Sequence, residues 1–288
     1  MPLSDVAVVG AAGLGGTATA TELASLGTEP LRVVREPQDQ GEVSFDTLLR
    51  SIRSVRSVAW CAGLSDHSLP DRDFSQARRR ELTSLQELLN SFRGGDLCLL
   101  SSAAVYSGRA GAVKEDDCRE PPVMPYGRIK YESEQLATQA LESGQLASLT
   151  IFRLMYMFGT GEPHRRLIKR LARARRSEEK VTVAGSGLSY LNPLPVGVVG
   201  QIIARRLLQG TAGVGIFNLN STEPFRVIDL VELLDAKGQV EVKAEGEKWP
   251  VHFWGDNTRL LGLLPELGQS MPDVRAELKA YYESLLVD

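Results

Sequence analysis

The stretch Val6-Ala7-Val8-Val9-Gly10-Ala11-Ala12-Gly13-Leu14-Gly15-Gly16 decides the fold of this chain. A short apolar run is followed at once by glycines, and small residues then continue to Leu26, before Gly27. This order predicts a buried strand, a glycine-rich turn and a helix that ends at Gly27. The amides of such a turn, together with a helix N-terminus, bind the pyrophosphate of a dinucleotide.

Strand and helix signals alternate through the rest of the first half. The predicted strands are Leu31–Val34, Val43–Phe45, Val58–Cys61, Leu97–Leu100 and Leu149–Phe152, and the predicted helices are Thr47–Arg53, a segment around Leu82–Phe92, and a segment from near Tyr126 to Gly144. Such alternation is typical of an α/β protein with a doubly wound parallel sheet. Ala62-Gly63 follows the fourth strand, and Ser102 follows the fifth.

The regularity loosens beyond Gly159. We expect a basic helix over about 164–177, a strand at 181–184, a loop at 185–195, a return strand at 215–219, and helices at 227–234 and 274–285. The domain prediction is a dinucleotide-binding domain over 1–158 with a return segment at about 192–222. Residues 159–191 and 223–288 would form a smaller substrate-binding lobe.

Composition excludes several classes of protein. The 288 residues carry 33 basic and 36 acidic side chains, so the net charge of −3 gives no reason to expect a nucleic-acid or membrane partner. We find neither a secretory leader nor an apolar run of the ~20 residues that a membrane span needs, which favours a cytoplasmic location. Three cysteines without CxxC spacing and three scattered histidines predict no metal site.

The segment Tyr126-Gly127-Arg128-Ile129-Lys130 supplies a candidate reaction centre. Residues four apart on a helix share one face, so the Lys130 ammonium is expected near the Tyr126 phenol and should lower its pKa toward neutrality. Such a tyrosine can exchange a proton with a carbonyl or alcohol, and the Ser102 hydroxyl can hold the reacting oxygen. A redox cofactor must then carry the hydride.

The end of the second strand bears on the choice of cofactor. Arg35 there favours NADP, because an arginine accommodates the 2′-phosphate, whereas an acid such as Glu36 would accept the 2′-hydroxyl of NAD. Asp46, expected to end the third strand, is either an adenine contact or a helix N-cap.

These motifs resemble those of the extended short-chain dehydrogenases/reductases of the NAD-dependent epimerase/dehydratase family. The resemblance rests on the glycine turn, Ala62-Gly63, the stretch Ser101-Ser102-Ala103-Ala104-Val105-Tyr106, Tyr126 to Lys130, Phe152-Arg153 through Phe158-Gly159, Asn218, and Asp256 to Gly262. It implies a Rossmann-type fold that binds NAD or NADP through Gly10, Gly13, Leu14, Gly16, Arg35, Asp46, Ala62, Gly63 and Lys130. It also implies that Lys130 contacts the nicotinamide ribose and that helices around 75–92 and 126–143 form a homodimer.

The sequence also departs from the family pattern near the substrate. Ala103 and Ala104 stand where the sugar-nucleotide dehydratases have an acidic pair, which argues against dehydration. Tyr156 lies where an asparagine is usual, and Pro195-Val196-Gly197 replaces an acidic signature. Ala103, Tyr156 and Tyr190 remain candidate substrate contacts.

Three functions stay open from the sequence. The first is an NAD(P)-dependent oxidoreductase of a small carbonyl or alcohol, a keto-sugar nucleotide included, with Ser102, Tyr126 and Lys130 as catalytic residues. The second is a nucleotide-sugar epimerase with tightly bound NAD, and the third is a non-catalytic dinucleotide-binding protein. We expect the basic residues between Arg165 and Arg176 to form the solvated side of an amphipathic helix, although one or two could bind a substrate phosphate.

Overall fold

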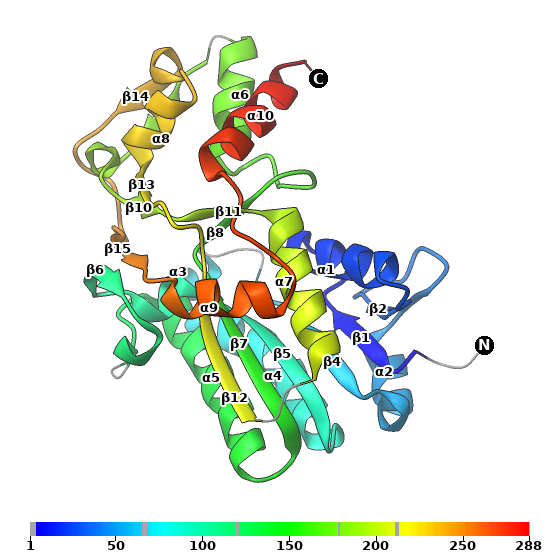
Figure 1. Ribbon diagram of the computed structural model, residues 1–288. Coiled ribbons are helices and arrows are strands. Elements are labelled where there is room, and N and C mark those ends of the chain that lie inside the picture. Colours follow the sequence, from blue (N-terminus) through cyan, green and yellow to red (C-terminus); the bar gives the residue numbers. More distant parts are fainter. Residues whose placement is uncertain (1–3, 65–67, 119–120, 178, 211–212, 288) are drawn as a thin grey trace.

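The computed structural model describes residues 4–64, 68–118, 121–177, 179–210 and 213–287. Within these residues, a seven-stranded sheet has the order β12-β7-β5-β4-β1-β2-β3, and all its neighbouring strands are parallel (Figure 1). Its strands are β1 (Val6–Val9), β2 (Leu31–Val33), β3 (Glu42–Val43), β4 (Ser57–Trp60), β5 (Gly95–Ser102), β7 (Leu146–Leu154) and β12 (Gly213–Leu219). The predicted doubly wound α/β fold is confirmed.

Helices cover both faces of this sheet. One face packs against α1 (Leu14–Ser25), α7 (Val196–Gln209) and α9 (Thr258–Glu266), whose apolar side chains share a core with β1 and β4. The other face packs against α2 (Phe45–Ser51), α4 (Phe74–Ser91) and α5 (Pro125–Glu142). Because both faces are covered, the central strands read as continuous apolar runs, as in β1, where all four residues are buried.

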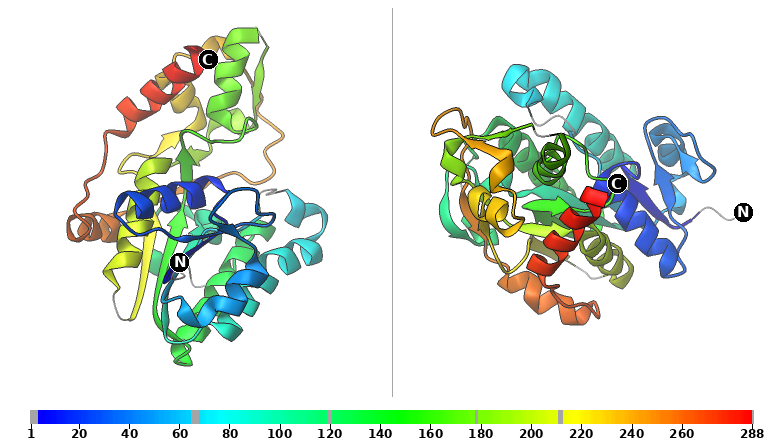
Figure 2. Two further views of the ribbon diagram at one scale, coloured as in Figure 1. Left: turned by 90° about the vertical axis from the view of Figure 1, so that its right-hand side faces the viewer. Right: turned by 90° about the horizontal axis from the view of Figure 1, so that it is seen from above.

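A second core lies above the carboxyl ends of the strands (Figures 1 and 2). It joins α6 (Leu167–Ser177), α8 (Val227–Leu233) and α10 (Val274–Val287). Short strand pairs complete this part and its junction, namely β8 (Tyr156–Phe158) with β11 (Pro193–Pro195), β9 (Val181–Val183) with β14 (Val240–Val242), β10 (Tyr190–Leu191) with β13 (Phe225–Arg226), and β6 (Ala110–Val113) with β15 (His252–Gly255). Helix α9 packs on one face of the large sheet, so part of the expected substrate-lobe segment belongs to the large core. The domain boundaries themselves stay a prediction.

Two local predictions are corrected by the structure. The third strand is only Glu42–Val43, because Ser44 caps α2 by accepting a hydrogen bond from the Thr47 N–H, so Phe45 and Asp46 are helical. The basic helix begins at Leu167 rather than near His164.

Helices α1 and α7 approach each other without side chains between them at one point. A Cβ atom on Gly200 of α7 would lie 2.5 Å from the backbone carbon of Ala18 in α1. The helix that starts at the glycine turn and the helix that starts beside the second core are therefore in direct backbone contact.

Candidate active site

The glycine turn sits where the strand order reverses, between β1 and β4. Gly10 has φ +84°, and a Cβ on it would lie 2.6 Å from the Ala62 nitrogen at the end of β4. A Cβ on Gly16 would lie 2.1 Å from the Gly10 carbonyl oxygen. These two glycines are thus required by the packing of the turn itself. In open parallel sheets this reversal point is where ligands bind.

Gly13 differs from its neighbours because the turn does not demand it. It is exposed, it caps α1 with φ −83°, and an added Cβ would meet only the Gly10 carbonyl oxygen, at 3.2 Å. Without a side chain here, an outside group can approach the first amides of α1, which have no partners within the helix. The turn therefore fits a dinucleotide pyrophosphate, with Leu14 at the first helical position.

The residues expected to choose between NAD and NADP lie beside this turn. Val33, the last residue of β2, accepts hydrogen bonds from the Gly10 and Ala11 amides at 2.9 and 3.1 Å. Arg35 and Glu36 follow two and three residues later, and both are exposed. Asp46 is an exposed residue in the first turn of α2, not the end of a strand, and an acid is favourable there for the helix dipole.

The structure brings Ser102, Tyr126 and Lys130 together, as predicted. Ser102 ends β5, and its hydroxyl accepts a hydrogen bond from the Ala104 N–H at 3.2 Å and also bonds to Tyr126. Tyr126 and Lys130 lie one turn apart in α5, which begins at Pro125, a residue suited to the first helical position. The centre therefore lies at the carboxyl ends of the sheet strands, the edge that carries the glycine turn.

Lys130 has a buried partner that sequence reasoning missed. Its ammonium lies 2.7 Å from Glu81 Oε1 on α4 and 3.3 Å from the Leu100 carbonyl oxygen. The two charged side chains are 3% and 2% exposed, so water does not screen their attraction. The other Glu81 oxygen accepts the Leu64 N–H at 2.8 Å. Glu81 therefore belongs to the site.

This partner changes the expected acidity of Tyr126. Loss of water contact raises the pKa of Tyr126 above its ordinary value; Lys130 acts to lower it, but Glu81 raises it further. The expected fall of the pKa toward neutrality is thus wrong for the protein without ligand. For Lys130, burial acts to lower the pKa, but the negative charges around it, first of all Glu81, together offset this, and the pKa stands above its ordinary value.

Gly63 lies over this ion pair. A Cβ on it would be 3.4 Å from Glu81 Oε1 and 3.6 Å from Lys130 Nζ, which is ordinary contact, and the residue itself is exposed. Packing alone would therefore tolerate a side chain. The bare backbone leaves room for a bound group to come close to Lys130, as the resemblance to the family implies for the nicotinamide ribose.

A second buried hydrogen-bond network lies next to Ser102 and includes its neighbour Ser101. Arg153 on β7 donates to both carboxylate oxygens of Glu134 on α5, with the shortest contact at 2.7 Å. Glu134 also accepts the Ser101 hydroxyl proton at 2.5 Å, and Arg153 donates to the Tyr106 hydroxyl at 2.8 Å. Because every charge here is paired, the network fixes α5 against β5, and thus Tyr126 against Ser102.

One residue of the basic segment, Arg166, stands apart from the solvated helix face. Arg166 lies just before α6, 2.9 Å from Glu162 and stacked 4.3 Å from the centroid of the Tyr156 ring. Its positive charge also acts on Tyr126, so it is not part of the solvated helix face. The sequence could have suggested this only through the pair of Arg166 with Glu162, four residues apart.

The three candidate substrate contacts have different surroundings. Ala103 is buried directly after Ser102, and the Tyr156 hydroxyl lies 3.1 Å from Glu162. Tyr190 packs its ring against Trp254, with centroids 4.9 Å apart. Contact of Ala103, Tyr156 or Tyr190 with a substrate therefore stays a prediction.

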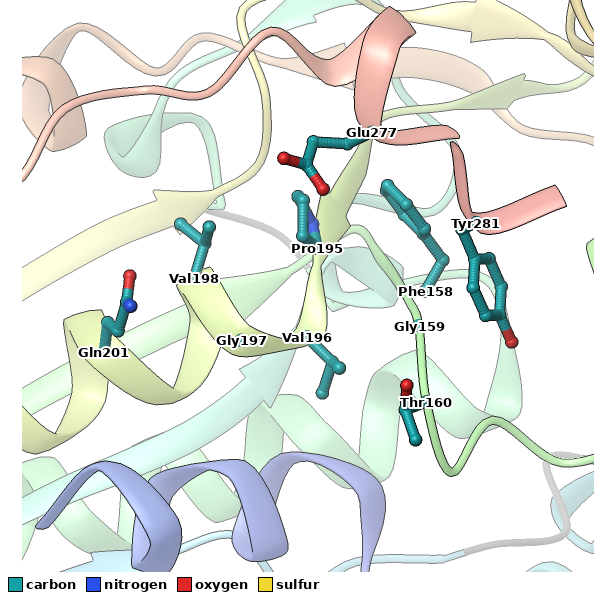
Figure 3. Close-up of a pocket in the computed structure, with 10 residues that line it drawn as sticks. All are labelled: Phe158, Gly159, Thr160, Pro195, Val196, Gly197, Val198, Gln201, Glu277 and Tyr281. Carbon is teal, nitrogen blue, oxygen red and sulfur yellow. The ribbon is translucent and has the colours of Figure 1, made fainter. Parts of the chain in front are cut away.

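A cavity of about 340 Å³ opens beside this site (Figure 3). It is bounded by the loop after β8, the start of α7 and the side chains of Glu277 and Tyr281 from α10. A Cβ on Gly161 in the same loop would lie 3.4 Å from Leu14 Cδ1, so this loop lies against the start of α1. The loop that bounds the cavity therefore also contacts the first residue of α1, while Ser102, Tyr126 and Lys130 are not among the residues that line the cavity.

Two kinds of feature are absent from the described residues, a membrane-spanning helix and a metal-binding cluster. No helix within the described ranges is both long and apolar enough to cross a membrane. No group of three or more potential metal-binding side chains occurs among the residues whose positions are given.

Comparison with known proteins identifies the class of this fold and site. The sequence model of the NAD dependent epimerase/dehydratase family matches residues 6–190. The chain belongs to this family, and it is an NAD(P)-dependent enzyme of the extended short-chain dehydrogenase/reductase type. No curated protein sequence matches it.

Solved structures share the fold over nearly the whole chain. MoeE5 in complex with UDP-glucose and NAD is 23% identical with a TM-score of 0.83, covering 97% of both chains. UDP-glucuronic acid 4-epimerase from Bacillus cereus, with UDP-glucuronic acid and NAD, is 16% identical with a TM-score of 0.83, covering 97% of this chain and 98% of that one. UDP-glucose 4-epimerase from Thermotoga maritima is 17% identical with a TM-score of 0.82, covering 96% and 97%. At these identities the likeness establishes the fold.

Proposed function

We propose that this protein is an NAD-dependent epimerase that acts on a secondary alcohol of a nucleotide-linked sugar. The observation that carries the proposal is the Ser102–Tyr126–Lys130 centre, placed at the sheet edge beside an open glycine turn. The similar structures named above hold NAD or UDP-sugars, or are UDP-sugar 4-epimerases, which supports the same chemistry here.

A dinucleotide held at the glycine turn would supply reversible hydride exchange with the substrate carbon, and return of the hydride to the opposite face would invert that carbon. Tyr126, as phenolate, takes the hydroxyl proton when the alcohol becomes a ketone, and gives it back when the ketone is reduced. Ser102 holds the reacting oxygen throughout. One hydride and one proton leave and return, so substrate and product differ only in configuration.

We propose NAD as the cofactor, in place of the NADP that Arg35 alone favours, because the similar structures that hold a dinucleotide hold NAD. Glu36 would then accept the ribose 2′-hydroxyl, and Arg35 would be a solvated side chain. Both residues are exposed, and they follow the strand whose last residue, Val33, is hydrogen-bonded to the turn. Calorimetry on the native protein and on Arg35→Ala tests this: the native protein should bind NADH more tightly than NADPH, and NADH affinity should be unchanged in the variant.

A reductase of a free carbonyl substrate is the second candidate. One observation favours it: with Glu81 paired to Lys130, Tyr126 starts as a protonated phenol, ready to donate. An epimerase needs the phenolate first, and the positive charge of an oxidised nicotinamide would help to produce it.

Cofactor analysis of the purified protein separates the two candidates. We expect the supernatant of denatured protein to contain co-purified NAD, and calorimetry to show that NADH binds more tightly than NADPH. Protein that is empty, and that binds NADPH reversibly and selectively, would contradict the epimerase and support the reductase. Conversion of UDP-glucose or UDP-glucuronic acid without net change in nicotinamide absorbance would then establish epimerisation.

The assembly state and location are part of the same proposal. A homodimer through α4 and α5 would cover Phe74, whose side chain is 37% exposed at the start of α4. Light scattering after gel filtration should give twice the chain mass of 31.4 kDa. A cytoplasmic location stays a prediction.

A further inference from the structure

Two ion pairs join helices α4 and α5, and they differ in their surroundings. Arg78 and Glu132 meet at the surface, with side chains 52% and 34% exposed. Glu81 and Lys130 meet inside the protein, with side chains almost wholly buried, at the reaction centre. The surface pair is of a kind that contributes little to stability, whereas the buried pair controls how much unbalanced charge the centre holds.

The Glu81 carboxylate has fixed partners on both oxygens. Oε1 accepts from the Lys130 ammonium and Oε2 from the Leu64 N–H. An ammonium has three donors, and Lys130 uses two of them on Glu81 and the Leu100 carbonyl. Among the contacts of the described residues, the third donor is left for a ligand beneath Gly63. Glu81 therefore both orients Lys130 and opposes the effect of its charge on Tyr126.

Several charged or titratable groups face Tyr126 and Lys130 from the surrounding elements. They are Glu81 from α4, Ser102 from β5, Cys61 next to the end of β4, Glu134 from the next turn of α5, and Arg166 from the segment before α6. Glu134 is bound to Arg153, and Arg166 to Glu162. Among the described residues, Glu81 is thus the acid in direct contact with Lys130.

We propose that Glu81 is a positioning residue of this site, which holds the Lys130 ammonium and keeps the Tyr126 phenol protonated at neutral pH. In the protein without ligand, Lys130 then cannot generate the phenolate by itself. Positive charge must arrive with the ligand before Tyr126 can accept a proton. Tyr126 would in this way be ready as a base only when an oxidised nicotinamide is bound, a consequence that rests on the proposed function.

The test is a titration that needs no substrate or cofactor. Tyrosinate absorbance is followed against pH for the native protein and for Tyr126→Phe, and the difference reports Tyr126 alone. The same pair of measurements is made with Glu81→Gln present in both proteins. We expect the Tyr126 midpoint to fall by about one pH unit or more in the Glu81→Gln background, because Lys130 is then an uncompensated charge next to the phenol.

Glu132→Gln is the matched control. It is the same substitution between the same two helices, and it should leave the Tyr126 midpoint unchanged. An unchanged midpoint in Glu81→Gln, or an equal shift in Glu132→Gln, would overturn the inference. All the proteins are freed of co-purified nucleotide before the titration, so failure of the proposed epimerase activity would not alter these results.

A second variant keeps the test open if Glu81→Gln does not fold. Glu81→Gln with Lys130→Met removes both buried charges, a change that proteins often tolerate. If Glu81 cancels Lys130 in the native protein, the Tyr126 midpoint should stay close to the native one. A marked rise in the double variant would show that Lys130 acts unopposed in the native protein, and the inference would fail.

Discussion

The Trp249 indole N–H lies 3.1 Å from each carboxylate oxygen of Asp71. Trp249 belongs to the segment between β14 and β15, whereas Asp71 lies in the short helix α3 (Leu69–Arg72), after the strand end that carries Gly63. Lys248 adds a contact of 3.2 Å to the same carboxylate. The contact fastens a long coil of the second half of the chain to the reaction-centre side of the sheet.

Trp249→Phe should loosen this coil without unfolding the protein. A hydrogen bond to a charged group contributes about 1.5–3 kcal/mol, and we expect a loss of free energy of unfolding at or below the lower end, because Trp249 is only partly buried. Limited proteolysis should cut within residues 244–250 several times faster than in the native protein. Lys248→Ala is the control, since an exposed ion pair contributes at most about 1 kcal/mol. Equal cleavage rates in native protein and Trp249→Phe would show that the contact does not hold the coil.

Tyr126→Phe should abolish turnover and leave cofactor affinity nearly unchanged. The phenol exchanges the proton, and loss of such a group lowers rates by about 10²–10⁴-fold. Calorimetry with NADH and an assay on UDP-sugars measure the two effects. Lys130→Met should instead weaken both binding and rate. Retained turnover in Tyr126→Phe would remove Tyr126 from the mechanism.

Two glycines three residues apart should respond differently to alanine. Gly16→Ala should destabilise the protein, because its Cβ would lie 2.1 Å from the Gly10 carbonyl oxygen, although alanine normally favours a helix by about 1 kcal/mol. Gly13→Ala should fold normally but bind dinucleotide at least about tenfold more weakly, since its methyl group would occupy the approach to α1. Thermal unfolding and calorimetry measure the pair. Unchanged affinity in Gly13→Ala would place the pyrophosphate elsewhere.

Glu134→Gln should be among the most destabilising single changes on α5. It leaves the Arg153 guanidinium buried without its counter-charge, and breaking one partner of a buried ion pair costs about 3–5 kcal/mol. Denaturant unfolding gives this value directly. The exposed pair provides the comparison, because Arg78→Gln should cost at most about 1 kcal/mol. Similar losses in the two variants would mean that the Arg153 network is not stabilising.

The three thiols should be nearly inert in the folded protein. Burial raises the pKa of Cys61 and of Cys98 to about 12 and that of Cys118 to about 11. The unfolded value is about 8.5, so stability from the protonated thiols is fully present below that pH and declines as the pH rises toward the folded values. At pH 8, iodoacetamide should label folded protein far more slowly than protein in urea, as measured by mass spectrometry. Equal rates would contradict the burial of these sulfurs.

Local patterns predicted the parts of the site that lie close in sequence. Ser102 and Tyr126 could be paired because a buried strand and a helix start have strong signals, and one helical turn links Tyr126 to Lys130. The glycine turn could be placed for the same reason. The separate role of each glycine in the turn could not be predicted. Gly10, Gly13 and Gly16 look alike in the sequence, and only the folded structure brings Ala62 against Gly10.

Contacts between distant segments could not be predicted. Glu81 follows three arginines in the sequence and has the pattern of a solvated helix face, yet it faces Lys130, 49 residues away. Arg166 was assigned to a solvated face for the same reason. Helix α7 was missed because it opens with Pro195 as its N-cap and with apolar and glycine residues, which resemble the loop before it.

The direct backbone contact of Gly200 with Ala18 has a consequence for how two ligands influence each other. Close-packed helices leave little room for independent movement, so a shift of α1 on filling of the glycine turn would be passed to α7 and to the cavity at its start. By thermodynamic linkage, if one ligand changes the affinity for the other by some factor, the second ligand changes the affinity for the first by the same factor. Dinucleotide and substrate would then bind as a heterotropic pair, joined through a contact in which neither ligand takes part.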